Sequence, residues 1–414
     1  MRQINRDTQL MIKINQTRYG DLCKSMLSET PRREMMWVLC NLIIILFFNG
    51  CIKITNIEED EGLVALNAND SLVIRTILDS NNLKYIKVKD VIKTEDSRVC
   101  FLDLHALGIT KIPEEIGRLN ALRALNLQGN MLRALPDEMF DLKVLKTLNI
   151  NYNMLDSVPM VIGSLLQLET LTVCGNNILY LPDTLRNLQK LILLSLAENQ
   201  LDSFSIILTN LKNLNSLYLG YNQIAIIPNV IINLCNLKRL NIEYNRIDSL
   251  PEEIGSLKSL EMLDLGGNRV INIPQSISSL QKLSWIILTG NQIYEFPEAI
   301  CDLTSLTWLS LGGNKLTDIS NSIGRIKNLV GLELCFNELI NLSDSIYLLE
   351  NLHSLLLSNN KLASLPDSII KIEKLTNLSL DYNNLCSLTV ELRIWANTYD
   401  PEWNITQACS SGIK

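Results

Sequence analysis

Residues 237–259 read LKRLNIEYNRIDSLPEEIGSLKS, and this pattern of 23 residues decides the fold. Leucine or isoleucine stands at its positions 1, 4, 6, 11, 14, 18 and 21, and asparagine stands at position 9. The same spacing recurs without an insertion from residues 99, 122, 145, 168, 191, 214, 237, 260, 283, 306, 329, 352 and 375. A fixed period of this length predicts a stack of small repeated units.

Each unit combines two apolar patterns of different period. Leu240 and Ile242 alternate as on a strand with one buried face, whereas Ile254 and Leu257 follow Pro251 at a helical spacing. One unit cannot bury its apolar face alone, so neighbouring units stack and their strands align into a parallel sheet. We therefore expect an α/β solenoid of thirteen repeats, with a curved sheet on the concave side and short helices or turns on the convex side.

An asparagine occupies the ninth position of every repeat except the first, which has Leu107 there. The side-chain amide can bond backbone groups of its own and the neighbouring unit that would otherwise be buried without a partner. We expect a structural ladder of asparagines through the stack. Its members are Asn130, Asn153, Asn176, Asn199, Asn222, Asn245, Asn268, Asn291, Asn314, Asn337, Asn360 and Asn383.

The repeats resemble leucine-rich repeats over residues 99–391. Their LPxxIxxL form is similar to that of exported bacterial surface proteins and lipoproteins, and to that of intracellular scaffolds related to Ras signalling. The resemblance implies a binding architecture. It does not identify a partner, because members of this family share the fold and differ in ligand.

An apolar run near the N-terminus indicates export. Residues 36–48, MWVLCNLIIILFF, are fewer than the ~20 residues that a membrane-spanning helix needs. Basic residues precede the run and Cys51 follows it, as in a secretory signal. Residues 48–51, FNGC, resemble a bacterial lipobox, which implies lipidation of Cys51, although the usual motif has Leu first and Ala or Ser second. Simple cleavage with secretion and a retained membrane anchor stay open.

These features divide the chain into six predicted segments. We expect an over-long gene start at 1–25, a signal peptide at 26–50, a tether at 51–69, an N-terminal cap at 70–98, the repeats at 99–391 and a C-terminal cap at 392–414. In the N-terminal cap, Asp70 and Ser71 are expected to begin a helix, and residues 85–88 are expected to form a strand. In the C-terminal cap, Trp395, Tyr399 and Trp403 are expected to cover the open end of the stack.

The repeat register limits the possible disulfides. Cys174 and Cys335 hold the same position seven repeats apart, which is about 34 Å at ~4.8 Å per strand, and therefore cannot pair. Cys235 and Cys301 are three repeats apart and are excluded in the same way. The expected pair is Cys386 with Cys409, provided that the chain reaches an oxidising compartment. The end of the chain also resembles those of exported bacterial repeat proteins, in which two such cysteines pair.

No motif in the sequence indicates catalysis, a cofactor or a metal site. The chain lacks a P-loop, a GxSxG elbow and an HExxH or CxxC pair, and the uninterrupted repeats leave no long loop for an active site. Its two histidines, His105 and His353, lie in distant repeats. The net charge of −7, with interspersed signs, argues against nucleic-acid binding. We expect a binding protein without a small-molecule substrate.

The variable strand positions form the candidate binding face. Trp285 and Trp308 hold the third position of adjacent repeats, and exposed Trp, Tyr and Arg commonly anchor interfaces. The rings could instead only pack on each other, as structural residues. The candidate residues are Trp285, Trp308, Ile287, Met262, Arg239, Tyr221, Tyr244 and Phe336.

Three functions follow from these expectations. The first is a lipid-anchored protein of the outer membrane or cell surface that binds a protein or a glycan. The second is an intracellular scaffold of the Ras-related type, which requires that the apolar run is not an export signal. The third is a structural component of the cell surface without a specific partner.

Overall fold

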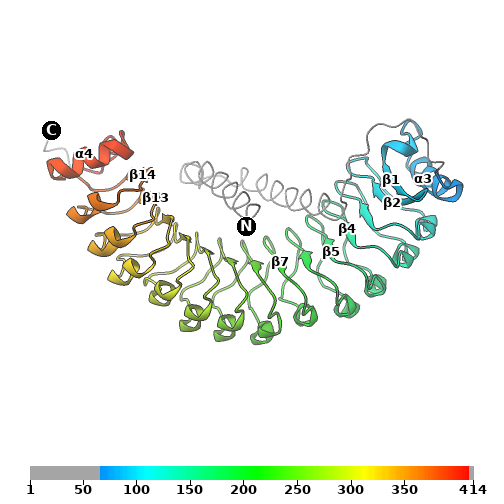
Figure 1. Ribbon diagram of the computed structural model, residues 1–414, viewed down its shortest axis with the longest axis horizontal. Coiled ribbons are helices and arrows are strands. Elements are labelled where there is room, and N and C mark those ends of the chain that lie inside the picture. The colour runs from blue at the N-terminus through cyan, green and yellow to red at the C-terminus, as the bar shows by residue number, and fades with distance from the viewer. Residues whose placement is uncertain (1–65, 410–414) are drawn as a thin grey trace. The chain divides into compact units, whose positions relative to one another are not determined.

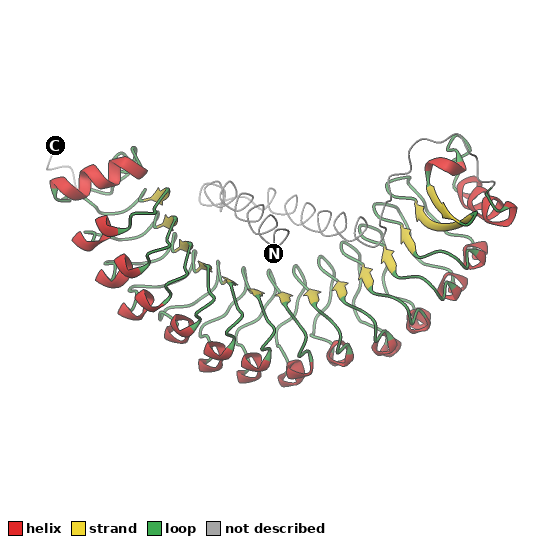
Figure 2. Cartoon of the chain, in the orientation of Figure 1, coloured by secondary structure: helices red, strands yellow, loops and turns green. Residues whose placement is uncertain are grey.

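The computed structural model describes residues 66–409. These residues form a single sheet of fourteen strands, in which the spatial order β1 to β14 follows the chain. In Figures 1 and 2 the strands line the inner side of the curved stack and the short helices line its outer side. The predicted leucine-rich repeat solenoid is therefore confirmed.

Thirteen of the strands correspond to the thirteen repeats. Neighbours from β2 to β14 pair in parallel with an offset of one repeat, so that Trp285, for example, lies beside Trp308. The additional strand β1 (Ile92–Glu95) pairs antiparallel with β2 (Arg98–Asp103). The other strands are β3 (Ala124–Asn126), β4 (Thr147–Asn149), β5 (Thr170–Thr172), β6 (Leu193–Ser195), β7 (Ser216–Tyr218), β8 (Arg239–Asn241), β9 (Met262–Asp264), β10 (Trp285–Ile287), β11 (Trp308–Ser310), β12 (Gly331–Glu333), β13 (Ser354–Leu356) and β14 (Asn377–Ser379).

The return segment of each of the first twelve repeats forms a five-residue 3₁₀-helix, and that of the last repeat enters helix α4 (Val390–Tyr399). In η8 (Glu252–Ser256), Pro251 stands before the first helical residue and Ile254 is buried. A tight, short helix suits this segment because only one or two turns fit between one strand and the next along the chain. The others are η2 (Glu114–Arg118), η3 (Asp137–Asp141), η4 (Met160–Ser164), η5 (Asp183–Asn187), η6 (Ile206–Asn210), η7 (Asn229–Asn233), η9 (Gln275–Ser279), η10 (Glu298–Asp302), η11 (Asn321–Arg325), η12 (Asp344–Leu348) and η13 (Asp367–Lys371).

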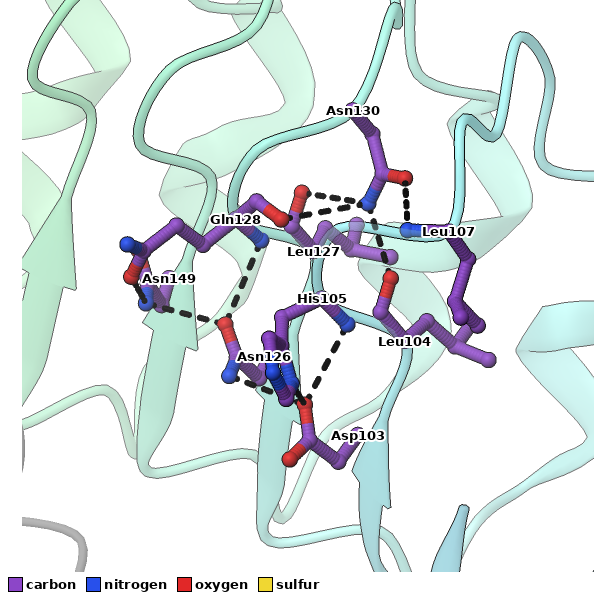
Figure 3. Close-up of polar contacts among 9 residues, drawn as sticks. All are labelled: Asp103, Leu104, His105, Leu107, Asn126, Leu127, Gln128, Asn130 and Asn149. Carbon is purple, nitrogen blue, oxygen red and sulfur yellow. Dashed lines mark hydrogen bonds and ion pairs between the residues drawn. The ribbon is translucent and has the colours of Figure 1, made fainter.

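The asparagine ladder runs through all twelve predicted positions. Asn245 donates from Nδ2 to the carbonyl oxygen of Leu219 in the preceding repeat, at 2.9 Å, and to that of Ile242 in its own repeat, at 3.2 Å. Its Oδ1 accepts from the N–H of Ile224 at 2.9 Å. Figure 3 shows the first member, Asn130, which donates to the carbonyl oxygens of Leu104 and Leu127 and accepts from the N–H of Leu107. Each amide thus ties two coils together.

The N-terminal cap differs from the sequence prediction at both of its elements. Helix α3 (Ala68–Ser80) is capped by the side chain of Asn67, three residues before the predicted Asp70. Residues 85–88 are not a strand, because the chain makes a turn there and enters η1 (Val88–Asp90) before β1 begins. One face of α3 is apolar and buried, and its residues are Val73, Ile74, Ile77 and Leu78.

Asp70 has a different role from the predicted cap. It is 1% exposed and accepts two hydrogen bonds from Arg98, at 2.9 and 3.0 Å, and one from the N–H of Val99, at 2.9 Å. The carboxylate therefore ties α3 to the first repeat strand.

The C-terminal cap consists of helix α4 (Val390–Tyr399) and the turns after it. Trp395 packs edge-on against Tyr399 with 5.7 Å between the ring centroids, and Trp403 is buried and donates to Asn397 at 2.8 Å. Cys386 and Cys409 form a disulfide, and Cys235 and Cys301 are thiols.

Several predicted segments lie outside the described residues. They are the gene start at 1–25, the signal peptide at 26–50, the lipidation site Cys51 and most of the tether. Among residues 66–409, none of the helices has the length and apolar character that crossing a bilayer requires.

Candidate functional site

The candidate site lies on the inner face of the sheet. Because strand residues alternate between faces, Arg239 and Asn241 point away from the core that Leu240 enters between them. The parallel register places the third positions of five strands in a row. That row is Arg239, Met262, Trp285, Trp308 and Gly331.

The two tryptophans form a stack in the middle of this row. Their ring centroids are 5.5 Å apart and the ring planes differ by 12°. Trp285 is half-buried, whereas Trp308 is only 3% exposed, so the prediction that both are exposed is wrong for Trp308. Gly331 explains the difference, because a Cβ there would lie 2.2 Å from the Trp308 ring. Trp308 fills the space over this glycine, and its other side stacks against the Trp285 ring.

The remaining predicted residues of the row differ in accessibility. Arg239 is exposed and Met262 is half-buried, so both are available beside Trp285. Ile287 is 9% exposed and contributes little surface. The exposed part of the predicted cluster is therefore Arg239, Met262 and the outer face of Trp285.

A second aromatic pair lies on the turn that follows the strands. The rings of Tyr221 and Tyr244 stack with 4.4 Å between their centroids and 20° between their planes. A Cβ on Gly267 of the next repeat would lie 2.7 Å from the Tyr244 ring, so this ring covers the glycine. The eighth positions of these three repeats, Tyr221, Tyr244 and Gly267, thus form one continuous surface beside the sheet, which we call the ledge.

The backbone at these tyrosines is strained. The eighth position has a positive φ in every repeat, 55° at Tyr221, 47° at Tyr244 and 55° at Phe336. Five repeats place glycine there, for which this conformation costs nothing, whereas it costs other residues roughly 1–2 kcal/mol. The same conformation occurs at non-aromatic eighth positions such as Ala106, Glu198 and Asn359. Phe336 shares the conformation and is half-buried, but no ring stacking within residues 66–409 joins it to the tryptophan pair.

Two buried carboxyl groups flank the tryptophans on the fifth positions of the strands. Asp264 is 6% exposed and accepts from the N–H of Gly266 at 3.0 Å and from Asn241 at 3.1 Å. Burial raises its pKa to about 6. Glu333 is 1% exposed, and burial also raises its pKa, although Ser310 donates to it. Neither residue was among the site residues predicted from the sequence.

A row of polar side chains crosses the N-terminal strands of the same face. Thr172 donates to Asn149 at 3.0 Å, Asn149 to Asn126 at 2.9 Å and Asn126 to Asp103 at 2.9 Å. His105 lies 2.8 Å from the same Asp103 oxygen (Figure 3). The sequence contained the signal for this row, since its four strand residues recur at the repeat spacing.

A third group, also missed, consists of apolar side chains outside the sheet. They are exposed on neighbouring repeats, in or near the outer helices. They include Met160, Leu179, Tyr180, Ile206 and Ile226. For Ile226 the sequence signal was residues 214–236, a repeat without a single charged side chain.

Comparisons with known proteins agree with this architecture. A family model described as a leucine-rich repeat region matches residues 98–225 and 221–341. A search of curated proteins gave no match. Among solved structures, a leucine-rich repeat protein of Leptospira interrogans is 36% identical with a TM-score of 0.68, over 70% of this chain and 74% of that one.

Two further structures share the fold. An internalin of Listeria monocytogenes is 23% identical with a TM-score of 0.56, over 75% of this chain and 94% of that one. The Arabidopsis receptor kinase HAESA, in complex with a peptide hormone and a co-receptor, is 27% identical with a TM-score of 0.66, over 77% of this chain and 58% of that one. Within residues 66–409 no group of acidic, histidine or cysteine side chains is arranged to hold a metal ion. The repeats, the asparagine ladder and these matches show that the chain belongs to the leucine-rich repeat family.

Proposed function

We propose that this protein is a non-catalytic binding module that holds a protein partner on the inner face of its sheet, outside the cytoplasm. The observation that carries the proposal is the support of Trp285 by the buried Trp308. A rigid, half-exposed tryptophan at the centre of a face is the usual anchor of an interface. The ledge of Tyr221 and Tyr244 extends this surface at a cost in backbone strain.

A protein is favoured over a glycan as the partner. HAESA, which shares the fold, was solved with a peptide hormone and a co-receptor bound. The candidate surface here also combines aromatic rings, a methionine and an arginine, a composition typical of protein interfaces. A polar row at Asn126 and Asn149 is the part of the face that suits a glycan, and a glycan ligand is the competing outcome.

The disulfide supports a location outside the cytoplasm. Cys386 and Cys409 are bonded, and disulfides persist mainly in oxidising compartments. This favours an exported protein over an intracellular scaffold. We further propose a lipid anchor at Cys51, with the protein displayed at the outer membrane or cell surface.

Substitution of the aromatic surface tests the binding proposal. Wild type and two variants, Trp285→Ala and the pair Tyr221→Gly with Tyr244→Gly, serve as baits for envelope proteins of the source cells. Glycine suits the positive φ, so the second variant keeps the backbone of the turn. The matched control is Tyr294→Ala, which removes an exposed ring outside the sheet.

The expected result is one partner captured by wild type and control and lost from both inner-face variants. Loss of an anchor side chain typically costs 2 kcal/mol or more, which is about a thirtyfold weaker complex. Equal capture by all four proteins overturns the proposal. A partner that is released by free oligosaccharide identifies the glycan alternative.

Mass spectrometry of the mature N-terminus tests the anchor. We expect the chain to begin at a diacylated or triacylated Cys51 and to leave the membrane fraction when Cys51 is replaced by alanine. A peptide from residues 3–18 in the mature protein contradicts both export and trimming. A mature chain that begins near residue 51 without acyl groups indicates secretion.

A further inference from the structure

We propose that the partner segment held on the inner face is basic, with a Lys or Arg side chain seated on Trp285 beside the carboxyl groups of the neighbouring strands. This inference rests on the proposed function and adds the chemistry of the partner.

The inner face and its adjoining turn are acidic. The third, fifth, seventh and eighth positions of the thirteen repeats contain six carboxylic acids and one arginine, Arg239. A basic partner is attracted to this surface and an acidic partner is repelled. The six acids are Asp103, Glu198, Glu243, Asp264, Glu333 and Asp381.

At the edge of the inner face, acidic side chains are paired with lysines of the same chain. At the second position of the repeats, Glu169 forms an ion pair with Lys146 at 2.8 Å, and Glu261 forms one with Lys238 at 3.4 Å. Acids at the edge are therefore already neutralised by the chain itself.

The two buried acids beside the tryptophans receive no such charge. Asp264 and Glu333 are bonded to neutral donors, and no Lys or Arg among residues 66–409 forms an ion pair with either. Burial disfavours their ionised forms, as the raised pKa values of both show. A cation brought by a partner reverses this effect, because an opposite charge nearby favours the ionised form.

The strand register places the Trp285 ring next to the carboxyl group of Asp264. On β9, Met262 and Asp264 point to the inner face, and on β10 they pair with Trp285 and Ile287. With about 4.8 Å between strands and about 3.3 Å per residue, diagonal neighbours on parallel strands lie roughly 8 Å apart, within the reach of one long side chain. A guanidinium on the half-exposed Trp285 ring can therefore approach Asp264 at the same time. Such cation–π contacts contribute about 0.5–2 kcal/mol.

Short labelled peptides provide the test. The probes alternate serine with arginine, glutamine or glutamate, and fluorescence anisotropy measures their binding to the full chain at low salt. The charge variant combines Glu243→Gln with Asp264→Asn. Its matched control combines Glu252→Gln with Glu253→Gln, which removes the same charge from the outer helix η8 of the repeat that contains Glu243.

The arginine peptide is expected to bind about tenfold tighter than the glutamine peptide, with the glutamate peptide weakest. The inner charge variant removes most of this preference, while the η8 control keeps it. Trp285→Ala weakens binding of the arginine peptide about two- to thirtyfold, which distinguishes contact with the Trp285 ring from general electrostatic attraction. Equal binding of the arginine and glutamine peptides, or equal losses in the inner variant and its control, overturns the inference.

Capture of the natural partner by the same variants distinguishes a failure of this inference from a failure of the proposed function. If Trp285→Ala abolishes its capture and the inner charge variant does not weaken it, the partner is not held through a cation, and only the further inference fails. If Trp285→Ala leaves its capture intact, the proposed function fails as well. Capture that falls in both variants, with a salt-sensitive affinity, supports both.

Discussion

Gln407 accepts a 3.0 Å hydrogen bond from the N–H of Leu385, the bond that a ladder asparagine accepts in each repeat. Its Nε2 donates to the carbonyl of Leu380 at 3.0 Å and to that of Trp403. One repeat earlier, Asn383 bonds Leu362, Leu357 and Leu380 in the same pattern. The longer glutamine side chain thus completes the ladder from the cap, where the repeat has already ended.

Gln407→Ala is expected to lower the free energy of unfolding by about 1–3 kcal/mol, because it leaves backbone groups at the end of the stack without partners. Urea denaturation followed by circular dichroism measures the effect. Gln275→Ala, at an exposed helix position, serves as the control and should change stability little. Identical curves for the two variants contradict the capping role of Gln407.

Asn245→Ala tests the ladder within the stack. It removes four hydrogen bonds, two of which join Asn245 to the preceding coil, so we expect a loss of roughly 1–3 kcal/mol, seen as a lower melting temperature. Asn229 is exposed at the start of η7, and Asn229→Ala is the matched substitution outside the ladder. An unchanged melting temperature for Asn245→Ala would refute the structural role.

Removal of the terminal disulfide should loosen the C-terminal cap. The bond closes a segment of 23 residues, for which loop entropy gives about 3 kcal/mol of stabilisation. Cys409→Ser is expected to unfold earlier than wild type in oxidising buffer and like wild type in reducing buffer. Cys235→Ser, at an exposed thiol, is the control. A peptide map of the native protein that finds both cysteines as thiols contradicts the bond.

Asp264 should make stability depend on pH. Its folded pKa of about 6 lies above the ordinary value of 3.8, so the proton stabilises the folded chain in acid, and this contribution is lost as the pH rises through about 6. Asp264→Asn should therefore match wild type near pH 4 and exceed its free energy of unfolding by roughly 1–3 kcal/mol near pH 8. Chemical denaturation at both pH values measures this difference.

The exposed carboxylate of Asp183 provides the control for this comparison. Asp183→Asn should show the same difference from wild type at both pH values. If Asp264→Asn also shows a difference that is independent of pH, the buried carboxyl group is not the source of the effect.

The repeat spacing predicted most of the fold because each unit obeys the same rule. Leu240, Asn245 and Ile254 have equivalents throughout the stack, so one unit determines the core, the ladder and the strand register. The caps obey no such rule. The sequence did not distinguish Asn67 from Asp70 as the helix cap, and it gave no reason to align Gln407 with the asparagines, because the tail leaves the period.

The candidate face was predicted only in part. The position of Trp285 beside Trp308 follows directly from the repeat length. The burial of Trp308 depends on the space over Gly331, and the charge environment of Asp264 depends on its hydrogen-bond partners, both of which are tertiary features. The order Trp285, Trp308 and Gly331 at the third positions can be read from the sequence. That Trp308 is buried over the glycine is visible only in the side-chain packing.

Oxidative footprinting of the complex with the captured partner tests the central claim most directly. Met262, Trp285, Tyr221 and Tyr244 on the inner side, and Met160, Tyr180 and Tyr294 outside the sheet, are oxidisable probes of the two surfaces. We predict that the partner protects Met262 and Trp285 and leaves Met160 and Tyr180 as reactive as in the free protein. Protection of Met160 and Tyr180, with Met262 and Trp285 unchanged, would contradict binding on the inner face.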